Sequence, residues 1–128
     1  MPVLWKAKQP YNVNVAASTA AIASLMDLDY LTSIVDLLKA ERLRLFNQLC
    51  QVPFLRPLPS QANFILCQVL SPFTALEIKT HLIDQGILVR YYNTPLLQDY
   101  IRISVGKPEH TDRLIAALAQ LSNLEEPA

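Results

Sequence analysis

The sequence predicts an α/β domain, a two-layer sandwich in which helices cover one face of a small, mostly antiparallel or mixed sheet. Two observations lead to this fold class. Apolar residues recur at helical spacing through residues 14–51, and short β-rich runs then alternate with further helical patterns. Short connections between neighbouring strands, with helices on one side, are typical of such sandwiches, and we expect about 3–4 strands.

The chain is expected to start with an extended arm, residues 1–13, because Pro2 and Pro10 both disfavour helix in the residue before them. Residues 14–51 then predict one long helix or two nearly continuous ones, with Asn14 as the N-cap. A bend is expected at the Asp27–Leu28–Asp29 step. Because this helix is longer than an isolated small domain normally needs, we interpret it as an interdomain helix.

The second part of this helix has a clear apolar stripe. Its members are Leu31, Ile34, Val35, Leu38, Leu45, Phe46 and Leu49. Glu41 and Arg42 interrupt the stripe. We expect their stems to lie along the edge of the core, with both charges outside it.

Residues 52–58 form a short, proline-containing run that predicts an edge strand, and residues 62–69 predict a buried strand. Ser71 and Pro72 have the pattern of a helix start. That helix is expected to end at Gly86, a suitable C′ residue. The residues expected to face inward from it are Ala75, Leu76, Ile78, Leu82 and Ile83.

Residues 87–91 predict a third strand and residues 100–105 a fourth. Pro108 begins a last helix, with Leu114, Ile115, Leu118 and Leu121 on its apolar side. The whole domain is expected to cover residues 14–122, and residues 123–128 a frayed tail.

Composition excludes several classes of function. Eleven basic residues balance eleven acidic ones, which argues against a nucleic-acid binder and a polybasic membrane anchor. No apolar run approaches the roughly 18 residues that span a bilayer. Cys50 and Cys67 lack zinc-site spacing, so we expect two buried thiols, no metal site and a cytoplasmic location.

The most informative residue for function is Arg102. Alternation along residues 100–105 puts Arg102 between two hydroxyl side chains, on the face opposite Ile101 and Ile103. Arg90 has the same position at the end of the preceding strand, so the two arginines are candidates for one anion site. The alternative is that both are solvated or paired with carboxylates such as Asp99. The spacing alone favours that alternative.

Five blocks of the sequence together resemble the C-terminal part of the histidinol-phosphate aminotransferase family. They run from about residue 6 to residue 121, and the last is the most specific. In order, they are QPYNVNVAASTAA, ERLRLFNQL, PSQANFIL, GILVRYYN and YIRISVGKPEHTDRLIAAL.

The resemblance implies a fold-type I, pyridoxal-phosphate-dependent aminotransferase that acts as a homodimer in histidine biosynthesis. Such enzymes interconvert histidinol phosphate and 2-oxoglutarate with imidazole-acetol phosphate and glutamate. It also implies that Arg102 binds the anionic group of the substrate and that Arg90 assists at the phosphate. By the same resemblance, Tyr11 and Asn12 belong near the mouth of the active site.

The chain departs from the family because the cofactor-binding large domain, with its Schiff-base lysine, is absent from this sequence. We therefore expect no catalytic residue here, no main cofactor-binding residue and no activity from the chain alone. Two other interpretations stay open. The chain is part of a sibling enzyme, such as threonine-phosphate decarboxylase or an aromatic aminotransferase, or it is a free-standing α/β module that binds without catalysis.

Overall fold

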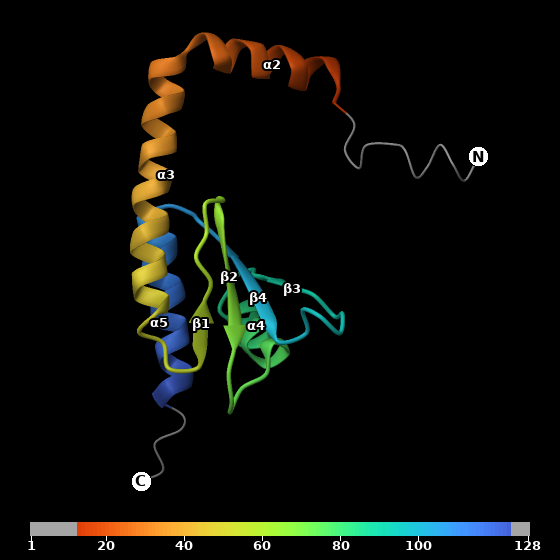
Figure 1. The fold of residues 1–128 in the computed structure, drawn as a ribbon, viewed down its shortest axis with the longest axis vertical. Coiled ribbons are helices and arrows are strands. Elements are labelled where there is room, and N and C mark those ends of the chain that lie inside the picture. The colour runs from red at the N-terminus through yellow and green to blue at the C-terminus, as the bar shows by residue number, and fades with distance from the viewer. Residues whose placement is uncertain (1–12, 124–128) are drawn as a thin grey trace, which may run out of the picture. The chain divides into compact units, whose positions relative to one another are not determined.

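The computed structural model of the chain describes residues 13–123 (Figure 1). Its contacts divide the chain into two compact units, the first of which ends at Val35. The first unit contains helix α2, Val15–Met26, and the start of helix α3, Leu28–Leu49. The second unit, from Asp36 onward, contains the rest of α3, the sheet and two further helices. Within the described residues, no helix is both long enough and apolar enough to cross a membrane.

The predicted long helix is two helices that meet at Asp27. Asn14 caps α2, as predicted, and its side chain accepts a hydrogen bond of 2.8 Å from the Ala17 N–H. Asp27 leaves the helical conformation, with φ −110° and ψ 68°, and its carboxylate accepts from the Tyr30 N–H at 3.2 Å. The helix is therefore interrupted because Asp27 serves as a cap for the first turn of α3.

The sheet has four antiparallel strands in the order β1-β2-β4-β3. Their bounds are β1 Leu55–Pro57, β2 Phe64–Val69, β3 Arg90–Tyr91 and β4 Tyr100–Ser104. β1 is an edge strand, as predicted, and the mostly antiparallel arrangement agrees with the predicted fold class.

Strand β3 is shorter than the predicted run of residues 87–91. The first of these residues, Ile87, belongs instead to the C-terminal cap of helix α4, Ala75–Asp84. The Ile87 N–H donates to the Leu82 carbonyl and the Gly86 N–H donates to the Ile83 carbonyl, both at 2.8 Å. This pair of bonds is a Schellman motif, and Gly86 has the φ of +73° that the motif requires. Gly86 is thus the C′ residue that the sequence predicts.

The start of α4 was predicted at the wrong residue. Thr74, not Ser71, is the N-cap, and it forms a capping box with Glu77. The Glu77 carboxylate accepts from the Thr74 N–H at 2.7 Å, and hydrogen bonds from Thr74 hold the pKa of Glu77 below its ordinary value. Leu76 and Ile83, predicted to face inward, are exposed, because only the stripe of Ala75, Ile78 and Leu82 is buried.

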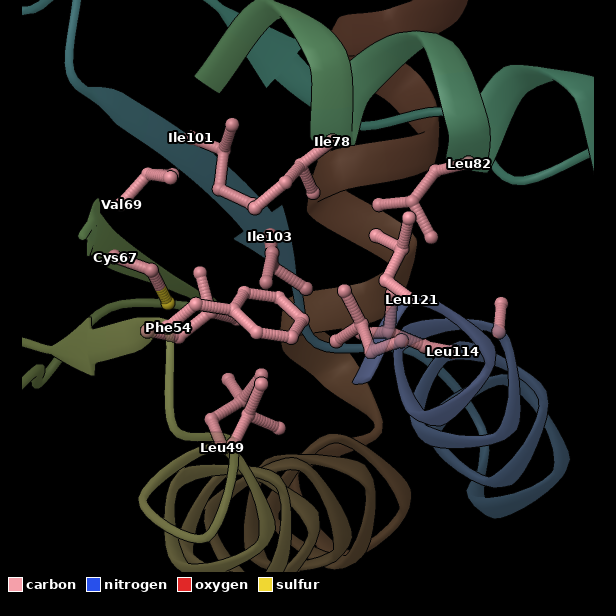
Figure 2. Close-up of a cluster of buried hydrophobic side chains, with 14 of the residues drawn as sticks. Leu49, Phe54, Cys67, Val69, Ile78, Leu82, Ile101, Ile103, Leu114 and Leu121 are labelled. Carbon is pink, nitrogen blue, oxygen red and sulfur yellow. The ribbon is translucent and has the colours of Figure 1, made fainter. Parts of the chain in front are cut away.

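One hydrophobic core joins the sheet to three helices (Figure 2). The sheet contributes one face, including Ile65, Cys67, Ile101 and Ile103, all of which are buried. Helix residues complete the core: Leu45 and Leu49 from α3, Ala75, Ile78 and Leu82 from α4, and Leu114, Ala117, Leu118 and Leu121 from α5, Pro108–Asn123. In the predicted stripe of α3, by contrast, Ile34 and Val35 are exposed.

The two cysteines differ. Cys67 lies in the core, where burial raises the pKa of its thiol to about 12 and makes it inert. Cys50, which was expected to be buried, is exposed because it follows α3 in a turn.

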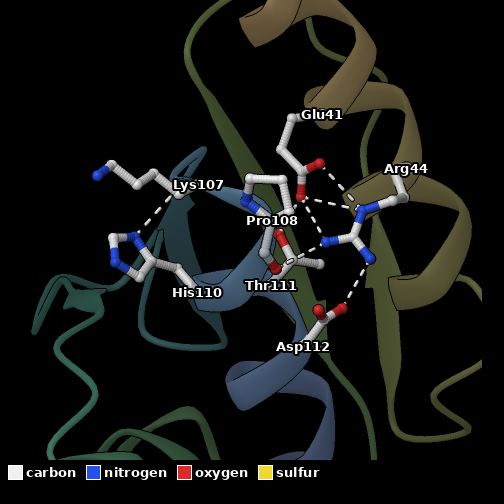
Figure 3. A network of polar contacts seen from close by, with 7 residues as sticks. All are labelled: Glu41, Arg44, Lys107, Pro108, His110, Thr111 and Asp112. Carbon is white, nitrogen blue, oxygen red and sulfur yellow. Dashed lines mark hydrogen bonds and ion pairs between the residues drawn. The ribbon is translucent and has the colours of Figure 1, made fainter.

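A buried carboxylate links α3 to α5 (Figure 3). Glu41 is only 8% exposed and accepts hydrogen bonds from the Thr111 hydroxyl at 2.5 Å and from Arg44. Arg44 also contacts Asp112 and the Pro108 carbonyl at the start of α5, each at 2.7 Å. The prediction that the charge of Glu41 lies outside the core is wrong. Hydrogen bonds from Thr111 and Arg44 replace those that water would donate to an exposed carboxylate.

Candidate anion-binding site

The face of the sheet away from the core is the candidate site, and we call it the open face. It carries Phe64, Leu66 and Gln68 from β2 and Tyr100, Arg102 and Ser104 from β4. These residues alternate with the buried ones, as the period of a strand requires. The helices pack on the opposite face, and within the described residues no further layer of this unit covers the open face.

Arg90 and Arg102 are directly opposite each other in the pairing of β3 with β4. Residues opposite each other in an antiparallel pair have their side chains on the same face, with Cβ atoms about 4.5–5.5 Å apart. The structure therefore brings the two predicted arginines together. Two like charges in this arrangement repel each other unless an anion lies between them.

Arg102 is held in a partly apolar setting. Leu66 is its partner on β2, and Phe64 is the diagonal neighbour two residues away. The guanidinium carbon lies 5.1 Å from the centre of the Phe64 ring. The Nε atom is buried, and no acceptor among the described residues lies within hydrogen-bonding distance of it. A buried donor without a partner is costly, so hydrogen bonds within the described residues do not explain the position of this side chain.

Arg90 is more open than Arg102. Its side chain is exposed, and its guanidinium carbon lies 5.3 Å from the centre of the Tyr92 ring. Both arginines thus have an aromatic neighbour, which is a favourable contact for a planar cation.

The alternative in which carboxylates neutralise these arginines is not seen in the part of the chain that the structure describes. There, the ion pairs join Lys39 to Asp36 and Arg44 to Glu41 and Asp112. Asp99 and Glu109, the acids nearest in sequence to Arg102, do not pair with it.

The other predicted site residues, Tyr11 and Asn12, lie outside the described residues. Sequence reasoning did not single out Phe64 and Tyr92 as neighbours of the arginines. Phe64 had a usable signal, because alternation along β2 puts it on the same face as Leu66, opposite the buried Ile65. Tyr92 follows β3 directly and had no comparable signal.

The open face does not fit a complete pyridoxal phosphate site. Of the described lysines, Lys39 lies on α3, Lys79 on α4 and Lys107 just before α5, and these helices pack on the opposite face of the sheet. A cavity of about 440 Å³ lies between the start of α5, the end of β4 and the Gly86–Val89 segment, but neither Arg90 nor Arg102 lines it. No group of three metal-binding side chains occurs within residues 13–123.

Comparisons with known proteins identify the family. The model of the family "Aminotransferase class I and II" matches residues 3–118. Histidinol-phosphate aminotransferase 1, chloroplastic, of Arabidopsis thaliana is 52% identical over 117 residues, which are 91% of this chain and 28% of that protein.

Two solved structures have the same fold. The histidinol-phosphate aminotransferase of Clostridium acetobutylicum has a TM-score of 0.78 at 25% identity, over 91% of this chain and 36% of that one. The enzyme of Sinorhizobium meliloti, solved in complex with pyridoxal-5′-phosphate, has a TM-score of 0.72 at 32% identity, over 84% of this chain and 29% of that one. The chain thus spans about a third of the length of these relatives. It belongs to the class I and II aminotransferase family, and it is similar to part of the histidinol-phosphate aminotransferases within that family.

Proposed function

We propose that this chain is the C-terminal part of a histidinol-phosphate aminotransferase and that its open face binds the anionic group of the substrate. The observation that carries the proposal is the direct pairing of Arg90 with Arg102, with no carboxylate paired to either in the described residues. Its substrates would then be a phosphorylated amine and, in the second half of the reaction, a dicarboxylic acid.

The two arginines suit a phosphate monoester in particular. A guanidinium presents a planar fork of donors that matches two oxygens of a phosphate or a carboxylate. A phosphate monoester carries nearly two negative charges at neutral pH and has three terminal oxygens. Such a group can accept hydrogen bonds from both arginines and neutralise both charges, whereas one carboxylate neutralises only one of them.

Within this proposal the chain binds and orients substrate but supplies no catalytic residue. Pyridoxal phosphate, when bound by a complete enzyme, acts as the electron sink for the reaction. The resemblance assigns the Schiff-base lysine that holds the cofactor to the large domain. We therefore propose that the chain alone is inactive and that its partner is that domain, in a homodimer of complete subunits.

The surface of the first unit supports the proposal that another domain covers it. Helix α2 has no buried residue, and several large apolar side chains on α2 and at the start of α3 are exposed: Ile22, Leu25, Met26 and Leu28. Monomeric proteins rarely leave such a group of side chains in water. Because the chain spans about a third of the length of its relatives, we propose the remaining part of the aminotransferase fold as the cover.

The test is a titration of the purified chain with inorganic phosphate at low ionic strength and pH 7.5, followed by two-dimensional NMR. We expect the largest shifts at Arg90, Arg102 and their strand neighbours, and the loss of binding in Arg102→Ala. Arg113→Ala is the matched control, because Arg113 is an exposed arginine of α5, which packs on the opposite face of the sheet. Equal binding by Arg102→Ala and wild type would contradict the proposal, as would a loss of equal size in Arg113→Ala.

A further inference from the structure

The position of Phe64 relative to Arg102 has a consequence for the anion site. Phe64 is opposite Ser104 and Leu66 is opposite Arg102 in the pairing of β2 with β4. Phe64 and Arg102 are therefore diagonal neighbours on the open face, a relation that long and aromatic side chains can bridge. They do so here, since the guanidinium carbon lies 5.1 Å from the ring centre.

The inner part of the guanidinium group is buried beside the Phe64 ring, and its outer part is accessible. Nε is the only nitrogen of Arg102 that is both buried and without a partner among the described residues. The two terminal nitrogens are not among the buried atoms that lack a partner. The part of the group that remains free to contact a ligand is thus the outer fork.

We infer that Phe64 is a positioning residue, which holds the Arg102 guanidinium in place for an anion on the open face. The inference rests on the proposed function. The electron-rich face of an aromatic ring attracts a cation, and the attraction is stronger where water is excluded. Without the ring, the Arg102 side chain gains conformational freedom and water reaches Nε. Binding an anion then costs the entropy of ordering the side chain again.

The inference predicts a modest, specific loss of affinity. We expect Phe64→Leu to weaken binding of inorganic phosphate about two- to fivefold, the effect of one cation–π contact at a partly exposed site. Phe64→Tyr keeps an aromatic face and should restore affinity to within about twofold of wild type. A role in stability alone would not produce this difference between leucine and tyrosine.

Phe73→Leu is the control for lost packing. Phe73 is a half-buried aromatic residue whose ring contacts Phe54 in the core, with 4.8 Å between the ring centres. This variant should lower stability without changing phosphate affinity, because Phe73 packs against the core cluster and not on the open face.

A ligand-free measurement separates this inference from the proposed function. In wild type without phosphate, the Arg102 Nε–H signal should be shifted by the Phe64 ring and should exchange slowly with water. Phe64→Leu should abolish both properties and weaken phosphate binding. The inference is overturned if the signal is unchanged in Phe64→Leu, or if the signal changes and affinity does not. An ordered Arg102 in a wild-type chain that binds no phosphate contradicts the proposed function, and with it the assigned role of Phe64.

Discussion

Arg90 and Arg102 lie directly opposite each other on neighbouring strands, with their side chains on the same face of the sheet. Like charges in this relation destabilise a sheet. The same face leaves Arg102 Nε buried without an acceptor in the described part of the chain. These two costs oppose the favourable contact of Arg102 with the Phe64 ring, so we expect stability and anion binding to be opposed at this pair.

The first prediction follows from that opposition. Arg102→Leu should raise the free energy of unfolding in phosphate-free buffer by up to about 1 kcal/mol, because it removes a like-charge contact beside Leu66. Urea denaturation measures the change. Arg56→Leu removes an arginine that has Gln68 opposite it and should bring no comparable gain. A clear loss of stability in Arg102→Leu would show that the arginine stabilises the fold and is not strained by its neighbour.

A second prediction concerns the link between α3 and α5 in Figure 3. Thr111→Val keeps the shape of the side chain but removes the hydroxyl that donates to Glu41. Hydrogen bonds to charged groups contribute about 1.5–3 kcal/mol, and Arg44 remains as a partner of the carboxylate, so we expect a loss near the lower end of that range. Thermal or urea unfolding tests it. A neutral effect would mean that Arg44 alone satisfies the carboxylate.

A third prediction concerns acid stability. Hydrogen bonds from Arg44 hold the pKa of Glu41 below its ordinary value; burial opposes this shift and the Thr111 hydroxyl adds to it. A lowered pKa in the folded state means that the ionised carboxylate stabilises the fold. The contribution is complete above the unfolded-state pKa of about 4.3 and is lost as the pH falls through the lower folded-state value.

The Glu41→Gln variant should therefore be less stable than wild type at neutral pH, and the difference should shrink as the pH falls below about 4.3. Denaturation midpoints from pH 7 to pH 3 provide the comparison. A difference that stays constant over this range would assign the effect of Glu41 to packing and not to charge.

A fourth prediction separates a part of an enzyme from a free-standing module. Because Ile22 and Leu25 are exposed on α2, the chain should self-associate at micromolar concentration. The double variant Ile22→Ser, Leu25→Ser should be more monomeric in analytical ultracentrifugation. Leu96→Ser is a control, since Leu96 is exposed but lies in the loop before β4. A monomeric wild-type chain would favour the free-standing module.

Much of the fold was predictable because it depends on local pattern. Alternation along residues 100–105 correctly predicts the two faces of β4, and Gly86 correctly predicts the end of α4. The start of α4 was predictable too, since Thr74 and Glu77 have capping-box spacing. The Ser71–Pro72 pair matches a simpler helix-start pattern, which predicts the wrong N-cap.

Other features depend on contacts that are distant in sequence. Glu41 is buried because Thr111, seventy positions away, donates to it, and no local pattern indicates that partner. The strand faces predicted that Arg90 and Arg102 share a side of the sheet. Their direct pairing also requires the register of β3 on β4, which the loop between the strands sets. That the two arginines bind substrate remains a prediction.

The central claim is that this chain holds the substrate-anion side of an aminotransferase and no Schiff-base lysine. The most direct test is to titrate the purified chain with pyridoxal phosphate, reduce with borohydride and map the modified lysines by mass spectrometry. We predict substoichiometric labelling spread over the five lysines at positions 6, 8, 39, 79 and 107. A stoichiometric reduced imine at a single lysine would contradict the claim and give the chain a catalytic residue of its own.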